Sequence, residues 1–195
     1  TSLLTYACSI IKPFRPQVPI YISALFPRML ALAGEVADGV ILTRSTLETA
    51  ADVRKQLDAA SQAAGRPAGS VKITSLLPTA VAKTRAEALD LMRPGVAFYA
   101  GFFPRYNRLL ASFGFAQETQ SIAEAFARGD HAGATRAVSD ALVDATSVAG
   151  TPEQCREKIA AYRDSGIDEP IISPFARGDG SAQIFSAAVQ ACAGA

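Results

Sequence analysis

Residues 18–43 contain two hydrophobic runs that are separated by a helical pattern. The runs, at residues 18–22 and 40–42, have the length of β-strands, and we expect both strands to be buried on two faces. Pro27 suits the first position of a helix, and the hydrophobic residues after it predict a helix over residues 27–36 with one broad apolar face. A strand, a helix and a second strand in so short a segment predict a parallel βαβ unit.

Three later helices are predicted from capping boxes, in which a hydroxyl side chain and the residue three positions on each cap a backbone N–H. The pairs are Ser45 with Glu48, Thr84 with Glu87, and Thr151 with Gln154. The first pair opens a helix over residues 46–64, and the alternating pattern that follows from Val71 predicts a strand that Pro78 bends or ends. A short strand at residues 170–173 and a closing helix at residues 181–192 complete the pattern.

Residues 84–148 have the texture of several helices rather than one. We expect breaks at Pro94-Gly95, Pro104, Gly114 and Gly129-Asp130. Most of the aromatic residues of the chain fall in this block. We interpret them as core, and the alternative is that Phe102, Phe103 and Tyr106 form the wall of a pocket.

Four strands, each followed by a helix, predict an α/β fold with a parallel sheet. Four βα units are half of a (β/α)8 barrel, and a complete barrel needs about 250 residues, whereas this chain has 195. We therefore predict a single domain over residues 1–195 that supplies four of the eight units, with a helical insertion at residues 84–148. The other half is absent or comes from another chain.

The composition argues against several classes of function. A net charge of +1, with acidic and basic residues intermixed, gives no electrostatic case for binding nucleic acid or an anionic membrane surface. No hydrophobic run approaches the length of a membrane span. Cys8, Cys155 and Cys192 lie far apart without histidines nearby, so we predict neither disulfides nor a metal site. We expect a cytoplasmic protein, and we interpret the start at Thr1 as the middle of a longer sequence.

Ligands of parallel βα folds bind beyond the carboxyl ends of the strands. There the chain offers hydroxyl groups, backbone N–H groups and the arginines Arg28, Arg44 and Arg177, but no carboxylate pair, histidine or cysteine. Nothing in these loops titrates near neutral pH, so we assign no catalytic residue. We interpret His131, outside these loops, as a surface residue or a residue at a helix start.

These strand ends have the features of an anion site. The turn at residues 23–26 leads into a helix N-terminus, where free N–H groups and the helix dipole favour a phosphate, and Arg28 adds a positive charge. Thr43 and Arg44 repeat the arrangement one strand later. The alternative interpretation is a plain turn and a plain loop, with Arg28 exposed to solvent.

Two segments carry a resemblance to a known family. They are VPIYISALFPRMLALAGEVADGVILT at residues 18–43 and VDATSVAGTPEQCREKIAAYRDSGIDEPIISP at residues 143–174. Found in this order, they resemble the carboxyl-terminal half of the luciferase-like monooxygenase superfamily, in the branch of deazaflavin-dependent oxidoreductases similar to methylenetetrahydromethanopterin reductase. The resemblance runs from Arg15 to Ser173. It implies a luciferase-like (β/α)8 barrel whose fifth to eighth strands lie in this chain.

The resemblance also implies a function for the strand ends. Members of the family bind FMN or coenzyme F-420, so it implies one of these cofactors and a hydride transfer to or from a small organic substrate. By position, the family's turn next to the cofactor phosphate corresponds to Ser23, Ala24, Leu25 and Phe26. Arg28 follows this turn closely. Thr43 and Arg44 correspond to the substrate side.

Two further expectations follow from the resemblance. The complete protein is expected to be an enzyme and a homo-oligomer, whereas the isolated chain is expected to be inactive. The alternative is a non-catalytic barrel relative, or a half-barrel that dimerises and has lost cofactor binding. This alternative rests on Leu25 and Phe26, because members of the family usually have glycine in that turn.

Overall fold

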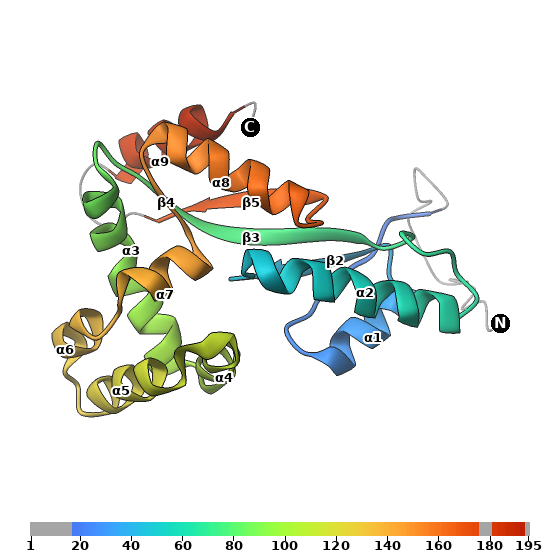
Figure 1. Ribbon diagram of the computed structural model, residues 1–195, viewed down its shortest axis with the longest axis horizontal. Helices are drawn as coiled ribbons and strands as arrows, with labels where there is room; N and C mark the ends of the chain where they lie inside the picture. Colours follow the sequence, from blue (N-terminus) through green and yellow to red (C-terminus); the bar gives the residue numbers. More distant parts are fainter. Residues whose placement is uncertain (1–16, 176–180, 194–195) are drawn as a thin grey trace, which may run out of the picture.

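The computed structural model describes residues 17–175 and 181–193. Within these residues five parallel strands form one sheet, as Figure 1 shows, and its parallel βα units confirm the predicted α/β fold. The strands are β1 (Tyr21–Ser23), β2 (Gly39–Thr43), β3 (Lys72–Val81), β4 (Val148–Gly150) and β5 (Glu169–Pro174).

The helices gather in three groups around this sheet (Figure 1). One group comprises α1 (Pro27–Val36) and α2 (Leu47–Ala63), which pack against each other, and another comprises α8 (Pro152–Asp164) and α9 (Ser181–Cys192). The third group, at the end of the molecule where β3 ends, consists of α3 (Arg85–Phe102), α4 (Pro104–Leu110), the π-helical turn η1 (Ala111–Phe115), α5 (Ala116–Ala127), α6 (His131–Arg136) and α7 (Asp140–Thr146).

Strand β3 is the long central strand, with β2 along its first half and β5 along its other edge. The prediction that Pro78 bends or ends this strand is wrong, because the strand continues to Val81. The backbone N–H of Phe175 donates a hydrogen bond to the Thr79 carbonyl, so the backbone N–H and carbonyl of Thr79 face β5. Its neighbour Pro78 then points away from β5, into the interval between the end of β2 and the start of β4, where no N–H is needed.

Strand β1 differs from its prediction. We expected both faces to be buried, but Tyr21 and Ile22 are half-buried, Ser23 is exposed, and Val18 and Ile20 lie outside the strand and are largely exposed. Only β2 flanks β1 among the described residues. A parallel strand is buried on both faces only when neighbouring elements cover it, and those neighbours are not in the described part of the chain.

Two of the three predicted capping boxes are confirmed, at Thr84 and at Thr151. The third is wrong, because the cap of α2 is Thr46, whose hydroxyl accepts from the Thr49 backbone N–H. Ser45 cannot serve as this cap, since its buried hydroxyl forms a hydrogen bond of 3.1 Å with the hydroxyl of Ser75. Because Ser45 pairs with a residue of β3, the helix cap lies one residue later than predicted.

The block at residues 84–148 forms several helices, as its texture predicted, but one of the expected breaks does not occur. Pro94 lies inside α3 and is exposed, so the carbonyl that loses its helical donor can be hydrated. Gly95 lies in close contact with another residue, because a Cβ there would lie 3.0 Å from the ring of Phe175. The expected break at Gly114 does occur, at a φ of 96°.

Hydrophobic side chains form two clusters, one under the strands and one within the insertion. The first joins the strands to α1, α2 and α8, around Leu57, Ile73 and Tyr162. The second joins α3, α5 and α7, around Met92 and Ile122. The insertion therefore has a core of its own, and it holds its position over the strand ends as a packed unit.

Candidate functional site

The ends of β1 and β2 lie side by side, as predicted for neighbouring parallel strands. Ser23 is level with Ile41, and the Ala24 N–H donates to the carbonyl of Ile41 over 3.1 Å. Beyond these ends is a cavity of about 480 Å³ whose lining includes Ala24, Leu25, Phe26 and Thr43. The structure thus brings residues of the predicted cofactor set and the predicted substrate set to one cavity. Ser23, Arg28 and Arg44 do not line it.

Helix α1 starts at this cavity with unpaired backbone donors. Its N-cap, Phe26, is extended and offers no side chain that could cap the helix. Pro27 has no N–H, and the N–H groups of Met29 and Leu30 both donate to the Phe26 carbonyl. The N–H groups of Phe26 and Arg28 have no acceptor among the described residues. Free donors at a helix start are suited to an anion.

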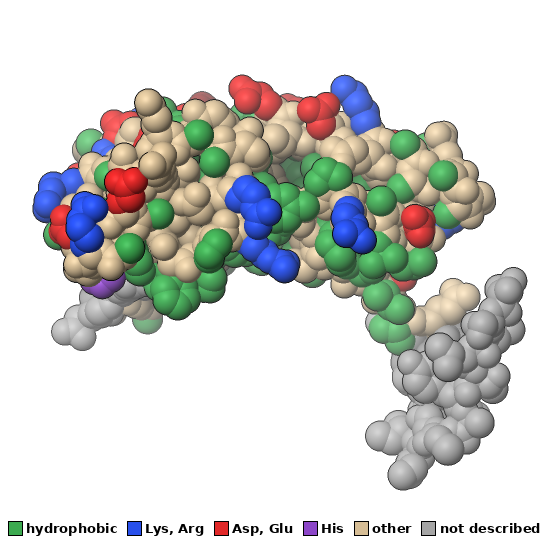
Figure 2. Space-filling model, turned by 90° about the horizontal axis from the view of Figure 1, so that it is seen from below, with side chains coloured by type: hydrophobic (Ala, Val, Ile, Leu, Met, Phe, Trp, Pro, Cys, Tyr) green, Lys and Arg blue, Asp and Glu red, His purple; other side chains and the backbone are tan. Residues whose placement is uncertain are grey.

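The helical insertion completes the cavity from the other side. Arg108 and Leu109 of α4 line it, with Ser112 and Phe113 of η1. The guanidinium of Arg108 lies 5.6 Å from the centre of the Phe26 ring, so it adds a positive charge near the start of α1. Figure 2 shows basic side chains among hydrophobic ones in the middle of the face that is seen from below. Sequence reasoning missed Arg108, because nothing in the local pattern joins α4 to the turn after β1.

Arg44 lies at the end of β2 but points elsewhere. It is 3% exposed, and its guanidinium carbon lies 4.3 Å from the centre of the Tyr99 ring in α3. Its Nη1 atom is buried without a hydrogen-bond partner among the described residues. Burial lowers the pKa of Arg44 to about 10, and the nearby Tyr99 and Tyr106 oppose part of that shift.

The backbone after Arg44 is fixed from two sides. The Ser45 hydroxyl meets that of Ser75 in β3, and the Ser45 carbonyl accepts a hydrogen bond of 2.7 Å from the Tyr162 hydroxyl of α8. Tyr162 is fully buried, and burial raises its pKa. A strand, a loop and a distant helix thus hold the end of β2 in one position.

Replacing Tyr162 with Phe is expected to lower the free energy of unfolding by about 1–2 kcal/mol, because the buried Ser45 carbonyl loses its donor. Denaturant unfolding of the complete gene product measures this change. Tyr21→Phe is the matched control, since the Tyr21 hydroxyl has no hydrogen bond to a described residue, and it should change the value by less than about 0.5 kcal/mol. Equal losses in the two variants would contradict the role of Tyr162.

Other candidate groups lie apart from this cavity. His131 starts α6 and packs on Phe126 at 4.5 Å between ring centres, which agrees with its predicted role at a helix start. Cys155 and Cys192 are buried, and burial raises the pKa of Cys155 to about 11, whereas Cys8 lies outside the described residues. Over residues 17–175 and 181–193, no group of three or more His, Cys, Asp or Glu side chains is placed to hold a metal ion.

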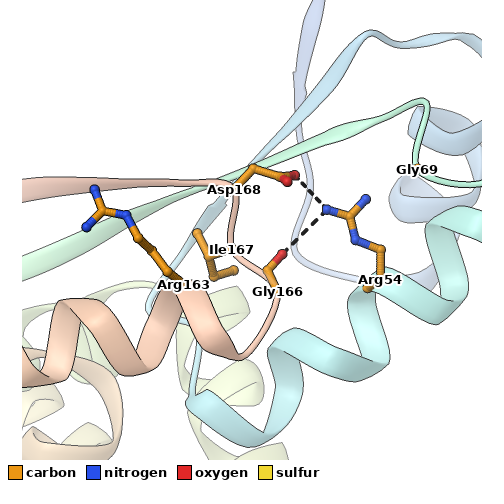
Figure 3. A pocket seen from close by; sticks show the side chains of 6 residues that line it. All are labelled: Arg54, Gly69, Arg163, Gly166, Ile167 and Asp168. Atoms are coloured by element: carbon orange, nitrogen blue, oxygen red, sulfur yellow. Dashed lines mark hydrogen bonds and ion pairs between the residues drawn. The ribbon is translucent and has the colours of Figure 1, made fainter.

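A second hollow lies at the amino ends of the strands, where β3 and β5 begin (Figure 3). Arg54 of α2 points into it and contacts Asp168, with 2.6 Å between guanidinium and carboxylate. The same carboxylate accepts the Ile73 N–H over 2.7 Å, and Arg54 also donates to the Val71 carbonyl. These contacts tie α2 to the residues that lead into β3 and β5, so we interpret this group as structural.

Asp168→Asn is expected to lower the free energy of unfolding by about 1 kcal/mol, because the ion pair is lost while an acceptor for Ile73 remains. Partial exposure of the pair, 24% and 30% of the two side chains, limits the effect. Thermal unfolding of the complete gene product measures it. The exposed pair of Asp52 with Lys55 provides the control, since Asp52→Asn should have almost no effect. If Asp168→Asn unfolds at the same temperature as the wild type, the structural role of Asp168 is refuted.

Comparison with known proteins identifies the family. The model of the family described as luciferase-like monooxygenase matches residues 5–169. The chain belongs to the luciferase-like monooxygenase family. It is 32% identical over 155 residues to 5,10-methylenetetrahydromethanopterin reductase of Methanolobus tindarius, and 29% identical over 164 residues to the protein of that name from Archaeoglobus fulgidus. These matches cover 78% and 81% of this chain but 47% and 49% of the relatives.

Solved structures agree on the fold of this luciferase-like chain. The coenzyme F420 dependent tetrahydromethanopterin reductase from Methanopyrus kandleri matches with a TM-score of 0.70 at 25% identity, over 80% of this chain and 45% of that one. An F420-dependent secondary alcohol dehydrogenase matches in fold with a TM-score of 0.63 at 17% identity, over 93% of this chain and 50% of that one. The chain spans about half the length of the curated relatives it matches, and its sheet is the matching part of a luciferase-like (β/α)8 barrel.

Proposed function

We propose that this chain forms the cofactor-phosphate side and one substrate wall of an F420- or FMN-dependent oxidoreductase. The complete protein would transfer a hydride between the cofactor and a small organic substrate. Membership of the luciferase-like family supports the class of enzyme. The F420-dependent reductase whose structure this chain matches supports F420 as the cofactor, and FMN, which the resemblance implies for the family, is the other candidate.

The single observation that carries the proposal is the cavity between the start of α1 and α4. It is open at a helix start with unpaired N–H groups at Phe26 and Arg28, and Arg108 lies on its far side. These donors fit the anionic end of a phosphorylated cofactor. Leu25, Phe26 and Phe113 provide apolar surface for the part of the cofactor next to the phosphate. When bound, the cofactor supplies the hydride-transfer chemistry.

The residues of this chain would bind and position the cofactor and the substrate, and they would not transfer protons. The cavity lining contains one carboxylate, the exposed Asp52, and neither His nor Cys among the described residues. Leu25 and Phe26 keep their side chains at the cavity while the backbone donors of Phe26 and Arg28 stay free. These free donors support an anion site in spite of the missing glycine, and the alternative of a relative that has lost its cofactor is not favoured.

Titration of the complete gene product with F420 and with FMN, followed by absorbance and fluorescence, tests the proposal. Saturable binding of one cofactor, followed by its reduction or oxidation when organic substrates are screened, is the expected result. Binding of neither cofactor would refute it. The expectations of a cytoplasmic homo-oligomer, of a single domain over residues 1–195 and of an inactive isolated chain stay predictions. Among the described helices, none is long and apolar enough to cross a membrane.

A further inference from the structure

One buried charged group, the guanidinium of Arg44, has no role in the cofactor cavity. It lies at the carboxyl end of β2 but outside the cavity lining, against Tyr99 of α3. Its Nη1 atom has no partner among the described residues, and no described carboxylate forms an ion pair with it. The Tyr99 ring contacts the guanidinium but supplies no acceptor for Nη1. A buried charge without an acceptor is strongly unfavourable, so we expect an anionic partner that comes from outside the described residues.

The backbone at Arg44 points to the same conclusion by an independent route. Its φ is 53°, and Arg44 is the only described residue other than glycine with a positive φ. Residues other than glycine rarely adopt this backbone conformation, and where they do, the surrounding structure holds the backbone in it. Here the Arg44 N–H donates to the Leu76 carbonyl over 3.4 Å, and Tyr162 fixes the next residue. The backbone from which the Arg44 side chain extends is therefore held in one place.

Aromatic rings extend from this guanidinium to the surface of the insertion. Tyr99 contacts Tyr106 at 4.9 Å between ring centres and Phe103 at 5.5 Å. Phe103 in turn contacts Phe102 at 4.8 Å, and Phe102 is 57% exposed. Edge-on and tilted rings of this kind offer an apolar wall for the body of an organic ligand, next to a cation that can bind its anionic group.

We propose that Arg44 binds the oxyanion of an acidic organic substrate, a carboxylate or a phosphate, whose apolar body lies along Tyr99, Phe103 and Phe102. This inference rests on the proposed function, because it assigns a substrate class to the same enzyme. Arginine is the side chain best suited to such an anion, since its planar donors can bind two oxygens at once. The guanidinium lies 4.3 Å from the centre of the Tyr99 ring, so an anion that binds to it changes the surroundings of that ring.

The test uses the complete gene product without cofactor, so that it can fail independently of the cofactor titration. The probes are benzoate, the neutral and similarly shaped benzamide, and inorganic phosphate. The near-UV circular dichroism of tyrosine and the melting temperature report binding. We expect benzoate or phosphate to bind saturably, benzamide to bind at least about 10-fold more weakly, and Arg44→Met to weaken anion binding about 10- to 100-fold.

Two comparisons separate a ligand site from a structural role. Arg44→Met should leave the melting temperature of the protein without ligand unchanged or raised, since it removes an unpaired buried charge. Arg44→Lys keeps the charge without the planar donors and should bind the anions with intermediate affinity. Arg128→Met, which changes an exposed arginine after α5, should behave as the wild type.

Three results would overturn the proposal. If neither anion binds the wild type, Arg44 has no oxyanion ligand. A clear fall in the melting temperature of Arg44→Met would mean that an acidic side chain elsewhere in the protein is the partner. If Arg44→Met weakens the binding of F420 or FMN as much as that of the anion probes, the guanidinium serves the cofactor and not the substrate.

Discussion

Replacing Phe26 with Asp is expected to weaken cofactor binding about 10- to 100-fold while leaving α1 as stable or more stable. Phe26 is the N-cap of α1 and has no side-chain hydrogen bond there. Asp is a preferred N-cap, so it would occupy the free backbone donors that the cofactor phosphate is proposed to use. It would also place a negative charge against the phosphate, and repulsion at such short range is worth about 1–3 kcal/mol. Titration of the complete gene product with F420 or FMN measures the change.

Phe26→Asn is the matched control for this substitution. It removes the same ring, including its contact with Arg108, and it also caps the helix, but it adds no charge. We expect the Asn variant to bind the cofactor about 10-fold more tightly than the Asp variant, with the difference shrinking as salt is added. Equal affinities in the two variants would mean that the phosphate does not lie at the start of α1.

Gly34→Val is expected to lower the free energy of unfolding by about 3 kcal/mol. Gly34 is where α1 crosses α2, and a Cβ there would lie 2.5 Å from the Ala60 Cβ and 2.9 Å from the Leu57 carbonyl oxygen. The Gly34 carbonyl also accepts hydrogen bonds from Ser61 and Arg66, so moving the helices apart would weaken those bonds as well. Denaturant unfolding of the complete gene product is the measurement.

Leu32→Val in the same helix is the control for Gly34→Val. It introduces the same β-branched residue at a position that is 42% exposed, and it should cost about 0.5 kcal/mol or less. Because α1 begins at the proposed phosphate site, Gly34→Val should also weaken cofactor binding, whereas Leu32→Val should not. Similar stability in the two variants would show that the contact between α1 and α2 can relax without cost.

The sequence was sufficient where a signal is local. Helix α1 has the predicted bounds because Pro27 fixes its start and its apolar positions share one face. Helix α9 likewise matches the predicted residues 181–192. The meeting of Ala24 and Thr43 at one cavity was also predictable, since neighbouring parallel strands end at the same edge.

The remaining features depend on contacts between distant residues. Strand β4 was missed because Val148–Gly150 is too short for a periodic pattern and forms only by pairing with the end of β3. Pro78 remains in a strand because of where its neighbouring strands end. At the candidate site, the position of Arg108 depends on how the insertion folds back, and the burial of Arg44 depends on α3 covering it. No local pattern contains this information.

The most direct test of the account is a crystal structure of the complete gene product with its bound cofactor. We expect a phosphate oxygen to lie within about 3.2 Å of the backbone nitrogen of Phe26 or of Arg28, in the cavity between α1 and α4. A cofactor phosphate bound away from the start of α1, with these two N–H groups still unpaired, would contradict it.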